Sequence, residues 1–168
     1  MNLREVQAEI ERRAAVIAAP PSYLPTYGKT TGHARPHLEV DGHGYHLVTV
    51  EQSVEESRAT TRDLDELLFL VFKGVTLGMA RDHELRHKVE DADPRRLLFA
   101  RQAELLKRLS VEWAKREAQE HERLLLVHPF DDGAMLRAKL CRQLREDGHS
   151  SEDAWQMACD RHPLPDDG

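Results

Sequence analysis

Apolar positions in the first seventeen residues recur every three or four positions, at Leu3, Val6, Ile10, Ala14 and Ile17. This spacing places them on one face of a helix and predicts an amphipathic α-helix. The helix must end before Pro20 and Pro21, because proline cannot continue it. The following stretch up to Pro36 is rich in proline, glycine and threonine, which is typical of a loop.

The pattern changes to alternation in the next stretch, "HLEVDGHGYHLVTVEQ". Leu38 and Val40 alternate with polar residues, the "DGHG" segment has turn chemistry, and Tyr45 to Glu51 is rich in β-branched residues. These features predict two strands joined by a short hairpin. The segment "ESRATT" is a candidate third strand.

From Thr61 onward the helical spacing returns and continues almost to the end of the chain. The widest apolar face belongs to a predicted helix from Asp63 to Val89, which we expect to be the central helix of the core. Asp93 and Pro94 have the residue types of a helix start, and Ser110 is the next cap candidate. Two last helices are predicted over residues 134–146 and 151–161, separated at Gly148.

We therefore expect an α+β fold: a predominantly helical bundle with a small antiparallel sheet of two or three strands near the N-terminal third. A two-stranded ribbon is not stable alone, so it must pack on helices. Residues 1–133 are predicted to form the main α+β domain. Residues 134–168 are predicted to be a C-terminal helical hairpin extension packed on it.

Charge and composition narrow the function classes. The 168 residues have a net charge of −6 and a sequence pI of about 5.9, which argues against nucleic acid as a partner. No apolar run has the length of a membrane span or of a signal-peptide core, and two cysteines cannot form a disulfide framework. We expect a cytoplasmic protein with reduced thiols, no membrane contact and no cofactor.

One pentapeptide, His83-Glu84-Leu85-Arg86-His87, fits the H-E-x-x-H pattern of zinc hydrolases. The two histidines lie one helical turn apart, as a shared metal requires, and the glutamate would polarise the metal-bound water. The pattern lacks an identifiable third ligand, and the charged neighbours Asp82, Arg86 and Lys88 are typical of a solvated helix end. We therefore assign no catalytic or metal-binding residues. The alternative hypothesis is a zinc-dependent hydrolase that uses this pentapeptide. The loop and hairpin histidines His33, His37, His43 and His46 have no ligand-like spacing.

Several stretches in a fixed order resemble the immunity protein 63 family of bacterial polymorphic toxin systems. They are "YHLVTVEQ", "DLDELLFLVFKGVT", an aspartate-bearing link into "RRLLFARQAELL", "WAKR" and the closing "HPFDD". The resemblance runs from about Tyr45 to Asp132. It implies an α+β protein without enzymatic activity that binds the toxin domain of a neighbouring secreted effector and neutralises it in the producing cell.

Two departures from the family pattern matter. The family tends to have an aromatic residue where His83 stands, so the resemblance favours a chance origin for the zinc-like pentapeptide. The "ERG" that follows the strand in the family is "EQS" here, which retains only Glu51. The family offers no binding residues to carry over, and it does not fix the chemistry of the toxin.

Acidic residues supply the candidate contact surface. They cluster at Glu51, Glu55 and Glu56 and again at Asp131 and Asp132, with a further group at Asp63, Asp65 and Glu66 beside a predicted helix start. Glu51, Glu55, Glu56, Asp131 and Asp132 are the candidate toxin-binding residues, because carboxylates can pair with lysines at a toxin's active-site rim and steer association. The alternative is a solvated surface, with the Asp63 group favouring a helix N-terminus.

The predicted C-terminal hairpin resembles a helix-turn-helix, and a third hypothesis is therefore that the protein is a DNA-binding regulator. Between Ala134 and His162 it carries Arg137, Lys139, Arg142, Arg145 and Arg161 against Glu146, Asp147, Glu152, Asp153 and Asp160. This balance is neutral, whereas a groove-reading helix is rich in arginine. We therefore expect a packing role for the hairpin, with Cys141 and Cys159 as small residues on its two arms.

Overall fold

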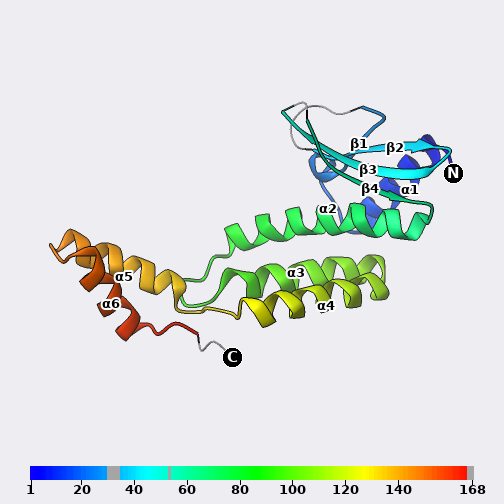
Figure 1. The fold of residues 1–168 in the computed structure, drawn as a ribbon. Helices are drawn as coiled ribbons and strands as arrows, with labels where there is room; N and C mark the ends of the chain where they lie inside the picture. The colour runs from blue at the N-terminus through cyan, green and yellow to red at the C-terminus, as the bar shows by residue number, and fades with distance from the viewer. Residues whose placement is uncertain (30–34, 53, 166–168) are drawn as a thin grey trace. The chain divides into compact units, whose positions relative to one another are not determined.

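The computed structural model describes residues 1–29, 35–52 and 54–165, and these residues form an α+β protein (Figure 1). The predicted fold class is thus confirmed. Along the described residues the order of the elements is α1 Leu3–Val16, the 3₁₀ helix η1 Pro21–Tyr23, β1 Thr26–Tyr27, β2 His37–Asp41, β3 Gly44–Glu51, β4 Val54–Thr61, α2 Leu64–Arg86, α3 Pro94–Leu109, α4 Val111–Val127, α5 Ala134–Glu146 and α6 Ser151–Arg161.

The chain divides into two compact units. The first unit comprises Met1–Met79 and Gln102–Lys115, and the second unit comprises Ala80–Arg101 and Arg116–Gly168. Helices α2, α3 and α4 each contribute residues to both units. The boundary predicted at residue 133 stays a prediction.

The sheet lies in the first unit and, in the described part of the chain, has four strands in the order β1-β2-β3-β4. Residues Gly42 and His43 join β2 to β3 in a two-residue hairpin, and the candidate strand "ESRATT" is confirmed as part of β4. The additional strand is β1, whose two residues pair in parallel with His37 and Leu38. The prediction of two or three antiparallel strands therefore lacked this parallel strand. Two residues are too few to show a periodic pattern in the sequence.

One face of the sheet and one face of α2 share the core of the first unit. Leu38 and Tyr45 of the sheet are buried together with Val6 and Ile10 of α1 and with Phe72 of α2. Figure 1 shows α1 behind the strands and the first part of α2 running along them. Because strand side chains alternate between faces, this burial leaves Glu39, His46 and Arg58 on the opposite face.

Trp113 at the start of α4 completes this core. Its ring lies 6.1 Å from that of Phe72 and 6.3 Å from that of Phe69, and its indole N–H donates to the Asp65 carboxylate at 3.0 Å. A buried tryptophan needs such an acceptor for its polar atom. Asp65, one of the acidic residues beside the predicted helix start, thus has a structural role.

Two glycines of α2 differ in what faces them, although the helix runs unbroken through both. A Cβ at Gly78 would lie 2.7 Å from ring carbons of Tyr23, whereas a Cβ at Gly74 would meet nothing within 4 Å. Gly78 therefore lets the Tyr23 ring lie directly against the helix backbone. Gly74 forms part of the wall of an open cavity of about 480 Å³.

We predict opposite effects for alanine at these two positions. Gly78→Ala should lower the free energy of unfolding by about 1–3 kcal/mol, because the Tyr23 ring must move. Gly74→Ala should leave it unchanged or raise it by up to about 1 kcal/mol, because alanine favours helix. Chemical denaturation of both variants measures the difference, and equal stabilities would show that Tyr23 is not held on α2.

Candidate functional site

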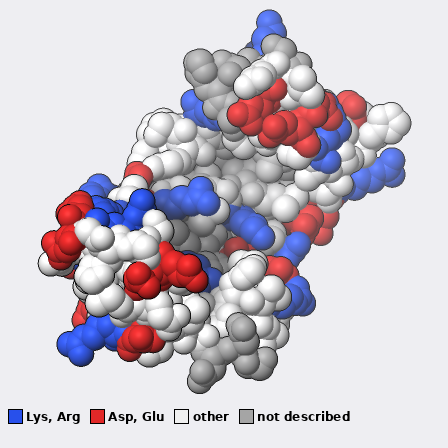
Figure 2. Space-filling model, turned by 60° about the vertical axis from the view of Figure 1, so that its left-hand side comes forward, with Lys and Arg blue, Asp and Glu red and all other residues white. Residues whose placement is uncertain are grey.

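The hairpin formed by β3 and β4 carries three of the five predicted binding residues, namely Glu51, Glu55 and Glu56. All three are exposed in the first unit. We call Glu51, Glu55, Glu56 and the neighbouring Arg58 the hairpin surface. Figure 2 is turned about the vertical axis from Figure 1, and red acidic side chains gather near its top, at the level that the sheet has in Figure 1.

Within the hairpin surface, Glu55 is held by an arginine. The Arg58 guanidinium donates to both carboxylate oxygens of Glu55, at 2.9 and 2.8 Å, and to Glu39 at 2.7 Å. These hydrogen bonds lower the pKa of both carboxyl groups and keep them ionised. Glu55 therefore presents an ordered and largely neutralised ion pair to solvent.

Glu51 and Glu56 differ from Glu55, since the structure gives neither of them an ion pair with a described residue. A bulge opposite Thr49 and Val50 leaves Glu56 without a partner in the β3 ladder, between Glu55 and Ser57. Gln52, beside Glu51, has a φ of 49° in the left-handed region. The two carboxylates thus supply the uncompensated negative charge of the hairpin surface.

Two buried histidines support the outward face of the sheet. The Nε2 atom of His37 lies 3.0 Å from Glu39, and His46 bridges Thr60 and Asp41, each at 2.9 Å. The hydrogen bond from His46 lowers the pKa of Asp41 to about 2. The contact of His37 lies within β2, whereas His46 of β3 ties β2 and β4 together. His33 lies outside the described residues.

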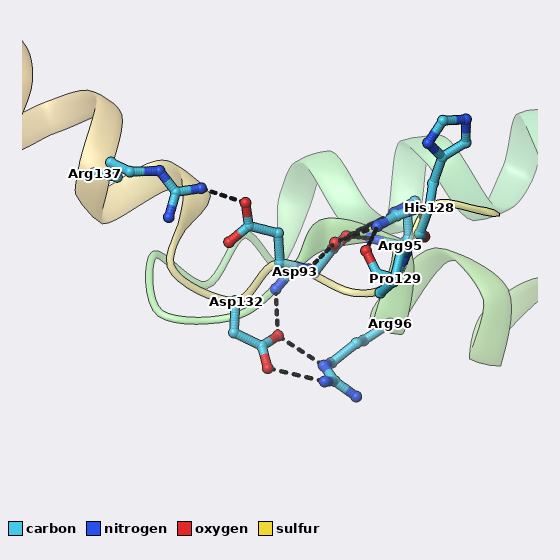
Figure 3. A network of polar contacts seen from close by, with 8 residues as sticks. Asp93, Arg95, Arg96, His128, Pro129, Asp132 and Arg137 are labelled. Carbon is cyan, nitrogen blue, oxygen red and sulfur yellow. Dashed lines mark hydrogen bonds and ion pairs between the residues drawn. The ribbon is translucent and has the colours of Figure 1, made fainter. Parts of the chain in front are cut away.

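The other two predicted residues, Asp131 and Asp132, belong to the second unit and take part in a network of ion pairs (Figure 3). Arg96 donates to both carboxylate oxygens of Asp132, at 2.7 and 2.8 Å, and Arg137 of α5 donates to Asp131. The hydrogen bond from Arg96 lowers the pKa of Asp132 to about 2. Both carboxylates are thus neutralised within the chain. Their role in binding stays a prediction.

Asp93 is the centre of this network. Its carboxylate, 6% exposed, accepts hydrogen bonds from the Arg95 guanidinium and from the backbone N–H groups of Arg95 and Asp131. Burial alone would raise its pKa, but these donors outweigh burial and lower it. Sequence reasoning identified Asp93 only as a helix start, although the same carboxylate also fixes the loop that follows α4.

Arg95 and Arg96 extend the network to the rest of that loop. Arg95 donates to the backbone carbonyls of His128 and Pro129, at 2.9 and 2.7 Å. Both guanidinium groups lie over the Phe130 ring, at 5.5 and 4.1 Å from its centroid. The "DPRR" and "HPFDD" segments, which carry part of the family resemblance, therefore hold each other in place.

The zinc-like pentapeptide lies at the C-terminal end of α2. The rings of His83 and His87 stack with centroids 4.2 Å apart, and Nδ1 of His87 lies 2.8 Å from the carbonyl oxygen of His83. In the part of the chain that the structure describes, no three His, Cys, Asp or Glu side chains are placed to hold a metal ion. The pentapeptide thus has no third ligand among the described residues.

The C-terminal hairpin is built as two antiparallel helices, α5 and α6, with the bounds that the sequence predicts. Arg137, one of its five basic residues, is buried and donates to the carbonyls of His162 and Pro163 at 2.8 and 3.1 Å. It therefore serves packing. Cys141 and Cys159 are half-buried free thiols.

Asp93→Asn should lower the free energy of unfolding by about 2–4 kcal/mol, because it leaves the guanidinium of Arg95 without its charged partner. Asp91→Asn, at a neighbouring exposed position, is the control and should change it by less than about 0.5 kcal/mol. Urea denaturation at pH 7 measures both. Similar stabilities of the two variants would contradict a structural role for Asp93.

We also predict that the destabilisation caused by Asp93→Asn depends on pH. The folded pKa of Asp93 is below its ordinary value of 3.8, so its contribution is complete above that value and is lost as the pH falls through the folded pKa. The stability difference between the unsubstituted protein and Asp93→Asn should therefore shrink as the pH is lowered below about 4. A difference that stays constant from pH 6 to pH 2.5 would show that the carboxylate is not stabilised by folding.

Comparison with known proteins gives a match to one protein family. The family model of immunity protein 63 matches residues 41–123, which include the hairpin surface and the segment that carries Asp93, Arg95 and Arg96. No curated protein and no solved structure matches the chain. No helix among the described residues is both long and apolar enough to span a membrane. The match over residues 41–123 agrees with the resemblance read from the sequence, and the chain belongs to the immunity protein 63 family.

Proposed function

We propose that this protein binds the toxin domain of a neighbouring secreted effector in the cytoplasm of the producing cell and neutralises it. The proposal is supported by membership of the immunity protein 63 family. Inhibition requires only that the bound protein cover the toxin's active site or its substrate path. Stable complexes of this kind bury about 1,600 Å² in total, which a single face of a small domain can supply.

The hairpin surface is the part of the first unit that we propose to face the toxin. Its carboxylates would attract the lysine and arginine residues that line the active sites of enzymes acting on phosphate-containing substrates. Glu55 is already paired with Arg58, so Glu51 and Glu56 supply the attraction. The surface would therefore act mainly on the rate of association and on its salt dependence.

Co-expression tests the function itself. The adjacent effector's C-terminal domain, expressed alone, should stop growth, and co-expression with this protein should restore it. The purified pair should form a complex of fixed stoichiometry that survives gel filtration. If growth is not restored and no complex forms with the domain encoded next to this gene, the immunity function is wrong.

Removal of the uncompensated charges tests the hairpin surface. The double variant Glu51→Gln, Glu56→Gln should bind the toxin domain about tenfold more weakly at low salt, mainly through slower association, with a weaker dependence on salt. The control Glu122→Gln, Glu146→Gln removes the same charge from exposed positions of the second unit. Surface plasmon resonance at several salt concentrations compares them, and identical association rates would place the contact elsewhere.

A further inference from the structure

Among the described residues no strand pairs with the outer edge of β4, which leaves a row of backbone groups there without a partner strand. β4 is the last strand of the sheet, and it runs for eight residues, Val54–Thr61. Among the described residues its backbone hydrogen bonds go to β3, and no loop or side chain bonds to the backbone of residues 54–60. All but one of the described residues from Val54 to Thr60 are exposed. An edge of this length is a template for another strand.

The turn between β2 and β3 identifies which groups face outward. In a two-residue hairpin the flanking residues, here Asp41 and Gly44, exchange both backbone hydrogen bonds. Bonding direction then alternates along β3, so Tyr45 and Leu47 bond to β4, at Thr61 and Ala59. The intervening residues of β4, Arg58 and Thr60, therefore direct their N–H and C=O groups away from the sheet.

Charge along this edge is uneven. Glu51, Glu55 and Glu56 lie at the hairpin end, whereas Thr60 and Thr61 lie at the other end, followed by Arg62. A strand added here would have its own side chains beside these residues, and opposite charges on neighbouring strands attract. The edge thus fits an extended segment that carries lysine or arginine at the end next to the hairpin. A second copy of this chain fits less well, because each copy has a net charge of −6.

We propose that the toxin docks by adding an extended, basic segment as a fifth strand at the outer edge of β4. This inference rests on the proposed function and specifies the contact through which it operates. Backbone hydrogen bonds from Arg58 and Thr60 provide the pairing, and the acidic hairpin end fixes the position and direction of the added strand. The toxin segment is recognised by its extended shape and its charge.

Two substitutions at one position separate the backbone from the side chain. Thr60→Pro removes the outward N–H, which proline tolerates at a sheet edge, and Thr60→Val keeps it. Both lose the hydroxyl that contacts His46, so they are matched in that respect. The Kd for the toxin domain used in the co-expression experiment should be about tenfold higher for Thr60→Pro than for Thr60→Val, as expected for loss of one backbone hydrogen bond.

Amide hydrogen exchange of the unsubstituted protein supplies a test that does not depend on the folding of a variant. The amides of Arg58 and Thr60 should exchange at least about tenfold more slowly in the complex than in the free protein. Unchanged exchange at both amides, or equal Kd values for two folded Thr60 variants, would overturn strand addition. Growth protection would then still support immunity.

Two other results would also overturn the proposal. If the free protein is a dimer in light scattering, and Thr60→Pro makes it a monomer without changing toxin affinity, the edge belongs to a second copy. If the unsubstituted protein binds no toxin domain at all, the proposed function and this inference both fail. Binding without protection of these amides, in contrast, removes only the inference.

Discussion

Burial of one apolar face of the sheet is the constraint on which the first unit depends. Four short strands are not stable without it, and Leu38 with its neighbours on β3 provides that face. A shift of one residue in register would exchange Leu38 for Glu39 in the core, so burial fixes the register. The outward positions of Arg58 and Glu55 are then determined as well. The geometry of the hairpin surface is thus a consequence of the core.

The second unit relies on a polar constraint at its centre. The carboxylate of Asp93 joins the first turn of α3 to the loop after α4, two segments that lie more than thirty residues apart in the chain. A buried carboxylate is costly unless donors surround it, and Arg95 with two backbone amides meets that need. Such a centre stabilises less than an apolar one of equal size. Its hydrogen bonds do, however, hold the loop after α4 in the observed arrangement.

The periodic spacing of apolar residues predicted those elements that are determined by the sequence of their own segment. The bounds of α5 and α6 agree with the predicted ones, because glycine, serine and the apolar spacing mark both ends. β1 could not be predicted, since its two residues depend on pairing with β2. The bulge beside Glu56 leaves no sequence signal either, because it arises from the fit between two strands.

Of the candidate site, the acidic residues could be predicted from the sequence, but their ion-pair partners could not. Glu51, Glu55 and Glu56 stand out as acidic residues, and the structure leaves all three exposed. Asp131 and Asp132 look identical to them in the sequence, yet Arg96 and Arg137 neutralise both. Their partners are brought close only by tertiary structure, and a count of charges cannot detect this. The arginine that orders Glu55 was also missed, although its spacing of three residues was visible.

Charge alone cannot account for tight binding at the hairpin surface. Ion pairs at an exposed rim add little affinity, because each carboxylate must give up water and the attraction is screened by salt. Glu55 would in addition have to leave Arg58 or share it. Affinity must therefore come from groups that a partner can satisfy without breaking an existing bond. At this edge of the sheet, those are the outward backbone groups of β4, and the role that we propose for the carboxylates is to select which strand reaches them.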